Sequence, residues 1–166
     1  DRLRGIVTER DFLKFVTVDQ AWQDMTLAEV MTAPAISLQW RNDLNPLEIV
    51  NLLQKYRIRH LPFLDENGQI FGLATHRLLR RVIEPLHLLR LRFVQEVMVH
   101  SVVHGAPDDS IWDLAHLMLK HKIGSIIVTV PHPNLSEAVL PLGIVTEQEI
   151  LHWRSLGLDL KTVTAE

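Results

Sequence analysis

Gly143-Ile144-Val145-Thr146 is the stretch that decides the fold, because its pattern of glycine, two hydrophobic residues and threonine occurs three times. The other copies are Gly5-Ile6-Val7-Thr8 and Gly72-Leu73-Ala74-Thr75, so that successive threonines lie 67 and 71 residues apart. A second string, Glu29-Val30-Met31, returns 67 residues later as Glu96-Val97-Met98. Two unrelated strings with nearly the same period predict a repeat array, and the repeat is about 67 to 71 residues long.

The composition is that of an ordinary globular protein. Of 166 residues, 47% are hydrophobic and 22% are charged, and the formal net charge is −3. This weakly acidic balance argues against nucleic acid as a partner, because nucleic acid requires a basic face. No apolar run approaches the roughly 18 residues of a membrane span, and no signal-peptide hydrophobic region follows the first residues. The chain has no cysteine, which excludes disulfides and a thiol nucleophile, and we expect a cytoplasmic protein.

The first complete repeat begins with a helical turn at 26–31, followed by a short strand at 35–38. Asn45, Pro46 and Glu48 then occupy the N-cap, the first and the third positions of a helix, which is a typical helix start. Hydrophobic residues at helical spacing predict its buried face: Leu47, Val50, Leu53 and Tyr56, flanked by Ile49 and Leu52.

The same repeat continues with two strands and a second helix. His60-Leu61-Pro62-Phe63-Leu64 is predicted to be a strand, and Asn67-Gly68 predicts a type I′ hairpin turn into a strand at 69–74. A helix is expected from Thr75 onward. The predicted order is therefore strand, helix, strand, strand, helix.

The second complete repeat follows the same order. It has a strand at 101–103, a helix capped by Ser110 with Asp113 at its third position, and strands at 126–128 and 141–145. We predict that the buried face of this helix consists of Ile111, Leu114, Ala115 and Met118. The repeat is six residues longer between its last two strands, and we assign the difference to a surface loop at Pro131–Ser136.

The repeats define the domain organisation that we expect. Residues 1–25 are interpreted as the last strand and helix of an upstream repeat with a linker, 26–84 as a complete unit, 85–97 as a connector and 98–154 as a second unit. Residues 155–166 are interpreted as the start of a linker to a further unit, because 162–166 resemble 26–29.

The chain resembles the cystathionine β-synthase (CBS) domain family. The glycine-threonine strings, the Glu-Val-Met strings, and the strand Arg59-His60-Leu61-Pro62-Phe63 with its turn at 65–68 carry the resemblance. The resemblance implies an α/β (α+β) fold of tandem units, in which two small sheets flanked by helices pair about a pseudo-twofold axis as a Bateman module. It also implies frequent dimerisation, clefts between paired units that commonly bind adenine nucleotides, and no catalysis within the module.

In family members that bind a ligand, the string continues as Thr-x-x-Asp. A threonine at a helix start offers backbone amides to a phosphate, and the acid can accept hydrogen bonds from two ribose hydroxyls. Thr8 and Asp11 keep this pattern, whereas Leu78 replaces the acid after Thr75 and Glu149 replaces it after Thr146. Thr146 with Glu149 is also a capping box, which would stabilise the helix without any ligand, and both interpretations stay open.

Further residues of the predicted nucleotide site precede or begin strands. Arg59 and His60 lie at the start of one middle strand, and Lys122 and Ser125 lie near the start of the other. Arginine and lysine can both bind phosphate, although solvated surface residues are the alternative. Ile36 and Val102, from the first strand of each repeat, complete the predicted set.

Other features predict no site. The nine histidines show no metal-ligand spacing, so we expect no metal site. The basic stretches 76–81 and 90–92 are interpreted as solvated helix faces, with contact to phosphate or an acidic partner as the alternative. The apolar residues of 86–94 are interpreted as core or as a subunit interface.

The leading hypothesis is a regulatory module, not an enzyme, that binds AMP, ADP or ATP as a regulatory ligand and requires no cofactor. It would form a homodimer and would act on a signalling output domain of the same chain, without contacting nucleic acid or a membrane. The alternative is a ligand-free scaffold or dimerisation module. Analogy with sensor histidine kinases and cyclic-dinucleotide synthases suggests the kind of parent protein.

Overall fold

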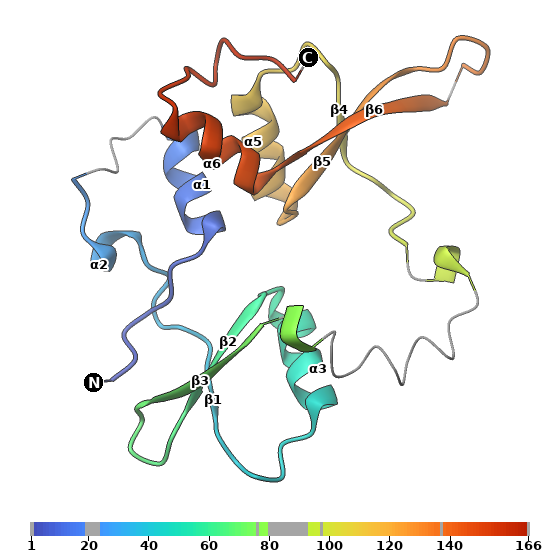
Figure 1. Ribbon diagram of the computed structural model, residues 1–166. Coiled ribbons are helices and arrows are strands. Elements are labelled where there is room, and N and C mark those ends of the chain that lie inside the picture. Colours follow the sequence, from blue (N-terminus) through green and yellow to red (C-terminus); the bar gives the residue numbers. More distant parts are fainter. Residues whose placement is uncertain are drawn as a thin grey trace. The chain divides into compact units, whose positions relative to one another are not determined.

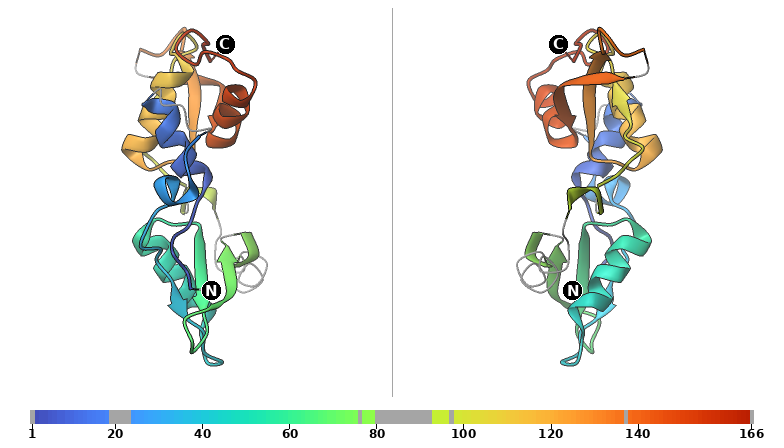
Figure 2. Two further views of the ribbon diagram at one scale, coloured as in Figure 1. Left: turned by 90° about the vertical axis from the view of Figure 1, so that its left-hand side faces the viewer. Right: turned by 90° about the vertical axis from the view of Figure 1, so that its right-hand side faces the viewer.

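The computed structural model describes residues 2–18, 24–75, 77–79, 93–96, 98–136 and 138–165. It contains two compact units, and each has its own three-stranded sheet (Figure 1, Figure 2). Unit 1 comprises Asp1–Ile6 and Thr32–Val99, and unit 2 comprises Val7–Met31 and His100–Glu166. The predicted mixed α/β fold with two small sheets flanked by helices is confirmed.

Unit 1 is a small sheet with one long helix. Its sheet has the order β1 (Leu38–Gln39), β2 (His60–Leu64) and β3 (Ile70–Thr75), with β1 parallel and β3 antiparallel to β2. The helix α3 (Pro46–Tyr56) lies between β1 and β2 in sequence, and a 3-10 turn η1 (Val94–Glu96) comes later in the chain. The buried core consists of Ile49, Leu53, Leu61, Phe63, Ala74 and Leu79.

The start of α3 was predicted correctly, but its buried face was predicted only in part. Leu47 N–H donates to the Asn45 side chain at 2.9 Å, and Pro46 occupies the first turn. Leu53 is buried, yet Leu47 is 46% and Tyr56 is 45% exposed. These two residues lie in the first and last turns of α3, while the strands of unit 1 are only two to six residues long. The middle of α3 therefore supplies the buried contacts.

The hairpin between β2 and β3 differs from the predicted type I′ turn. A type I′ turn needs positive φ at both central residues. In the described chain, Gly68 has φ +75, whereas Asn67 is not among the non-glycine residues with positive φ. Gly68 N–H donates to the Asp65 carbonyl at 3.0 Å, and the Asp65 carboxylate accepts from the N–H groups of Asn67 and Gln69. The aspartate side chain therefore organises this turn.

Unit 2 contains the larger of the two hydrophobic cores. It contains β4 (His104–Gly105), α5 (Ile111–His121), β5 (Ser125–Pro131), β6 (Val139–Thr146) and α6 (Glu147–Ser155). The sheet order is β4-β5-β6, with β4 parallel and β6 antiparallel to β5. The predicted buried face of α5 is confirmed, because Ile111, Leu114, Ala115 and Met118 are each fully buried. The Ser110 cap is also confirmed, since its side chain accepts from Asp113 N–H at 3.1 Å.

The first strand of each repeat begins later than predicted. The predicted strands at 35–38 and 101–103 become β1 at Leu38–Gln39 and β4 at His104–Gly105, so Ile36 and Val102 precede the strands. Hydrophobic character identifies residues that can face a core, but not the residues whose backbone pairs with a neighbour. Only two residues of each segment pair with the middle strand.

The six additional residues of the second repeat lengthen the whole hairpin. Compared with β2 and β3, both β5 and β6 are two residues longer, and the connecting loop at 132–138 is two residues longer than that at 65–69. Pro131, predicted to be in a loop, ends β5 and pairs with Val139. The resulting long hairpin extends from unit 2 (Figure 1).

The helix α1 (Glu9–Thr17), which precedes both complete repeats, packs within unit 2. Leu13 is fully buried and Val16 is 5% exposed, and both belong to the same core cluster as α5, β5, β6 and α6. The short helix α2 (Leu27–Val30) follows and also belongs to unit 2. The segment whose sequence marks it as the end of a repeat is therefore part of the core of a different repeat.

A substitution at Gly105 would test how tightly unit 2 is packed. A Cβ atom at this position would lie 2.5 Å from Leu114 Cδ2 and 3.0 Å from Asp109 Oδ2. We expect Gly105→Ala to lower the free energy of unfolding by about 1–3 kcal/mol, measured by urea denaturation. Gly143→Ala is the matched control, because its Cβ would meet no atom within 4 Å, and a cost equal to that of Gly105→Ala would contradict the packing described here.

Candidate functional site

The sheet register of unit 2 brings several predicted site residues to one end of the sheet. Ser125 at the start of β5 lies opposite Thr146 at the end of β6. His104 pairs with Ile127 in the parallel ladder, and Val102 lies two residues before this pair in the segment that leads into β4. We call Val102, Lys122, Ser125 and Thr146 the sheet end of unit 2; in Figure 1 it lies where β6 continues into α6.

Lys122 is held at this end by its backbone. It terminates α5 in the left-handed conformation, with φ 55, and its N–H donates to the carbonyls of Met118 and Leu119. Its own carbonyl accepts from Arg10 Nη2 at 3.3 Å. The side chain is exposed, so its ammonium group can reach an anion in solvent.

Thr146 and Glu149 form the capping box that the sequence predicts. Glu149 Oε2 accepts from Thr146 N–H at 2.8 Å and from Thr146 Oγ1 at 2.9 Å, and Glu149 N–H donates to Thr146 Oγ1 at 3.3 Å. All of these contacts to the carboxylate use Oε2. In the part of the chain that the structure describes, Glu149 Oε1 accepts no hydrogen bond.

Equivalent capping bonds occur elsewhere without a predicted ligand site. Glu29 Oε2 accepts from Thr26 N–H at 2.7 Å and from Thr26 Oγ1 at 2.8 Å at the start of α2. Thr26 does not follow a glycine-threonine string. The backbone N–H of Thr26, and then its hydroxyl group, lower the pKa of Glu29. The capping box at Thr146 therefore accounts for the start of α6 without any bound ligand.

The motif with the best sequence match has both of its carboxylate oxygens engaged. Asp11 is 4% exposed, and its Oδ2 accepts from Thr8 N–H at 2.9 Å and from Thr8 Oγ1 at 2.8 Å. Lys14 Nζ donates to Asp11 Oδ1 at 2.9 Å. A ribose hydroxyl would have to share these oxygens with the present donors and reach a residue that is only 4% exposed.

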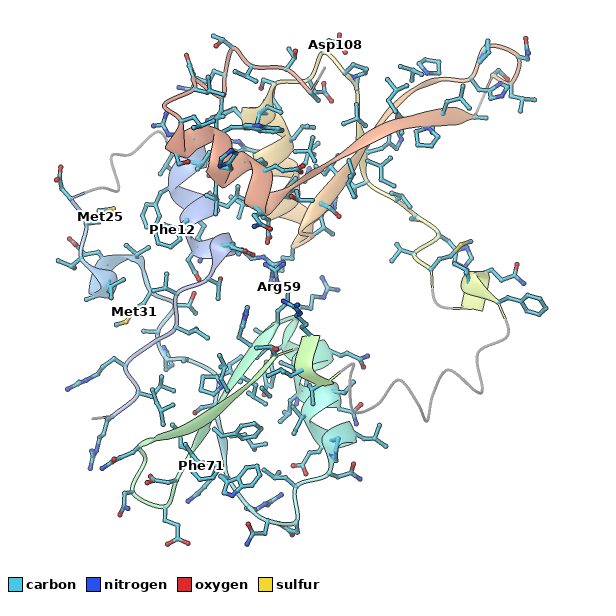
Figure 3. All side chains as sticks on the ribbon, viewed as in Figure 1. Phe12, Met25, Met31, Arg59, Phe71 and Asp108 are labelled. Atoms are coloured by element: carbon cyan, nitrogen blue, oxygen red, sulfur yellow. The ribbon has the colours of Figure 1, made fainter. Side chains whose placement is uncertain are left out.

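In unit 1 the register brings His60 opposite Thr75, as the equivalent residues are placed in unit 2. Thr75 Oγ1 accepts from Leu78 N–H at 3.2 Å, but Leu78 offers no carboxylate in return. Ile36 is 36% exposed, and Arg59 is exposed just before β2, where Figure 3 shows its side chain extending past the strand end. Unit 1 thus has the hydroxyl and a cation without the acid.

An ion pair between a buried carboxylate and a partly exposed arginine lies next to the sheet end of unit 2. Glu147 is 2% exposed, and its Oε1 accepts from Arg10 Nε at 3.2 Å. Glu147 N–H donates to the Gly124 carbonyl at 3.1 Å. Sequence analysis missed both residues, because partners 137 positions apart leave no local pattern.

Glu149 also lines a cavity of about 380 Å³, which we call the edge cavity. Its other lining residues are Pro107, Val128, Leu142, Gly143, Ile144, Val145, Trp153 and Ala165. None of Val102, Lys122, Ser125 and Thr146 lines it. Glu149 therefore lies between two distinct surfaces, the predicted sheet end and an apolar cavity along β6.

The described residues contain no cluster of three or more His, Cys, Asp or Glu side chains suited to a metal ion. In the same part of the chain, no helix is both long and apolar enough to cross a membrane. Much of the basic stretch at 76–81 and of the apolar connector lies outside the described residues, so their predicted roles stay predictions.

Comparison with known proteins agrees with this architecture. The family model "CBS domain" matches residues 42–85 and 94–156. The chain is 37% identical over 75 residues to inosine-5'-monophosphate dehydrogenase of Thermoplasma acidophilum, covering 45% of this chain and 14% of that protein. It is 23% identical over 122 residues to L-aspartate semialdehyde sulfurtransferase of Methanocaldococcus jannaschii, covering 74% of this chain and 22% of that protein.

A solved structure shows the same fold. A Methanocaldococcus jannaschii protein, described as an archaeal homologue of γ-AMPK, superposes with a TM-score of 0.71 at 20% identity. The superposition covers 95% of this chain and 58% of that chain. This chain therefore spans only part of each of these three proteins.

The buried ion pair predicts an asymmetric response to mutation. Arg10→Met leaves the Glu147 carboxylate buried without this cation, and we expect a loss of about 3–5 kcal/mol in the free energy of unfolding. Arg10→Met with Glu147→Met should recover most of that loss, because it removes both charges. Arg41→Met is the control, since Arg41 forms only exposed ion pairs and should cost about 1 kcal/mol or less. Equal losses for the Arg10 and Arg41 variants would refute this assignment.

The capping box of α2 predicts a pH dependence. Because the pKa of Glu29 is lowered in the folded chain, its contribution to stability is present at neutral pH and is lost as the pH falls through that lowered pKa. We expect Thr26→Val to raise the Glu29 pKa partway, since the valine keeps the N–H donor, whereas Thr26→Ser should leave it lowered. NMR titration of the Glu29 carboxyl measures both, and an unchanged pKa in the valine variant would contradict the hydroxyl contribution.

Proposed function

We propose, because the chain belongs to the CBS domain family, that it is a regulatory module whose unit 2 binds an adenine nucleotide at its sheet end. The observation that carries the proposal is the convergence of a cation, two hydroxyls and a carboxylate on one end of one sheet, with an exposed apolar side chain in the segment that leads into β4. Val102 is 48% exposed and would contact the base. Lys122 and Ser125 would contact phosphate, and Thr146 with Glu149 would contact the sugar.

The capping box decides which part of the nucleotide Glu149 can take. Its carboxylate already lies at the start of α6, where a phosphate would otherwise benefit from the helix amides, and two anions there would repel each other. Glu149 Oε1 retains acceptor capacity for the hydroxyl hydrogens of a ribose. The phosphate is therefore assigned to Lys122, and the ribose to Glu149.

The finer part of the proposal concerns regulation. A bound nucleotide changes the activity of an attached output domain only if it binds one conformation of the protein better than another. Control of a signalling output domain and action as a homodimer belong to this proposal, together with AMP, ADP or ATP as the ligand.

A second candidate function is a ligand-free scaffold. The observation that favours it is the capping box at Thr26, whose Glu29 carboxylate accepts the same two hydrogen bonds without any predicted ligand site. The Asp11 carboxylate, which already accepts hydrogen bonds from Thr8 and Lys14, also favours this alternative. In this alternative, the three threonine-capped helices serve folding alone.

Isothermal titration calorimetry with AMP, ADP and ATP distinguishes the two functions. In the sensor, at least one of these nucleotides binds, and Thr146→Ala with Glu149→Ala weakens the binding about 10- to 100-fold, because a charged hydrogen bond contributes about 1.5–3 kcal/mol. Thr26→Ala with Glu29→Ala is the matched control, since it removes an equivalent capping box away from the site and should leave the affinity unchanged.

Lys122→Met gives an independent measurement. The Lys122 backbone conformation terminates α5, and methionine preserves the length of the side chain while removing its charge. We expect ATP to lose more affinity than adenosine in this variant. The absence of binding for all three nucleotides to the unaltered chain would refute the sensor and favour the scaffold.

A further inference from the structure

Arg10 connects two segments of unit 2 that meet at the sheet end. Its Nε donates to the Glu147 carboxylate at 3.2 Å, and its Nη2 donates to the Lys122 carbonyl at 3.3 Å. Glu147 is the first residue of α6, directly after Thr146, and Lys122 terminates α5. A single guanidinium group therefore joins the turn before β5 to the start of α6.

The turn at 122–124 has a second link to α6, through the backbone. Glu147 N–H donates to the Gly124 carbonyl at 3.1 Å, and the ladder then pairs Ser125 with Thr146. This link does not need a particular side chain at position 147, because both of its groups belong to the main chain. Lys122 lies two residues beyond it, where Arg10 supplies the contact to α1.

The backbone of Lys122 depends on such contacts. Its φ of 55 lies in the left-handed region, which is unfavourable for a residue that carries a Cβ. Lys122 N–H donates to the carbonyls of Met118 and Leu119, and Arg10 binds the carbonyl of the same residue. The direction of the Lys122 side chain follows from this backbone, because the allowed rotamers depend on φ and ψ.

Arg10 is presented by a packed helix. Leu13 and Val16 of α1 are buried in the core of unit 2, and the Glu147 carboxylate that binds Arg10 is also buried. The helix α1 follows the first glycine-threonine string, ahead of both complete repeats. A residue from outside the second repeat therefore contacts the residue of that repeat to which the phosphate is assigned.

We infer that Arg10 is a positioning residue for the nucleotide site of unit 2, and that the placement of α1 thereby sets the affinity of this site for phosphate. This role rests on the proposed function. A shift of α1 that withdraws Arg10 releases the Lys122 carbonyl and the direction of its side chain, while Thr146 and Glu149 keep their capping bonds. Because coupling between two sites is reciprocal, a bound nucleotide phosphate also stabilises the placement of α1.

Arg10→Lys separates positioning from charge compensation. Lysine keeps a cation beside the buried Glu147 carboxylate, but its ammonium is a point charge without the planar fork that reaches two acceptors. We expect this variant to bind ATP about three- to tenfold more weakly in isothermal titration calorimetry, since the apparent Kd rises as the competent fraction falls. Adenosine, which has no phosphate, should keep its affinity. Arg41→Lys is the matched control, because Arg41 forms only exposed ion pairs, and it should change neither affinity.

A double-mutant cycle tests whether Arg10 acts through Lys122. In a protein that carries Lys122→Met, Arg10→Lys should cause no further loss of ATP affinity, whereas independent roles would give additive losses. Amide hydrogen exchange tests the reciprocal effect in the unaltered protein, where ATP should slow the exchange of the α1 amides.

The outcomes separate this role from the proposed function. Equal ATP affinities of the Arg10→Lys and unaltered proteins, additive losses in the cycle, or unchanged exchange in α1 would overturn the role of Arg10 while leaving the nucleotide site in place. Absence of ATP, ADP and AMP binding to the unaltered chain would refute the proposed function, and the role of Arg10 with it.

Discussion

The change from strand to helix at the glycine-threonine string is the constraint on which this structure depends. At Thr146 the chain leaves its ladder with β5 and enters a helix whose first N–H groups have no partner within the helix. The threonine hydroxyl and the acid three residues later supply those partners. The same junction fixes where β6 ends, where α6 starts, and thereby which residues gather at the sheet end.

Local chemistry explains which parts of the fold the sequence could predict. Helix starts were predicted at Asn45 and Ser110 because a cap needs only residues three positions apart. The buried face of α5 followed from helical spacing, since a long hairpin and neighbouring helices cover the helix. Spacing misplaced Leu47 and Tyr56, because the extent of the opposing sheet, which the local pattern does not contain, decides which turns of α3 are buried.

In the candidate site, too, local sequence patterns predicted some of the residues and missed others. Ser125 and Thr146 lie opposite each other because the antiparallel ladder of β5 and β6 is regular, and the predicted hairpin already indicated that these two strands pair. The Arg10–Glu147 ion pair depends instead on packing of α1 within unit 2. An acid at the first position of a helix is usually solvated, and no neighbouring residue indicates that Glu147 is 2% exposed. Tertiary packing, not local sequence, creates its environment.

The three glycine-threonine strings differ in whether the acid that caps the helix can still accept a hydrogen bond from a ligand. At Thr8, the acid is Asp11, and Lys14 one turn later engages the oxygen that the cap leaves. At Thr75, Leu78 provides no acid at all. At Thr146, the residue equivalent to Lys14 is His152, and Glu149 Oε1 keeps its acceptor capacity within the described chain. The position three residues after the acid and the burial of the acid thus distinguish Asp11, which is 4% exposed and bound to Lys14, from the exposed Glu149, and this difference favours Thr146 over Thr8 as the ligand-binding string of unit 2.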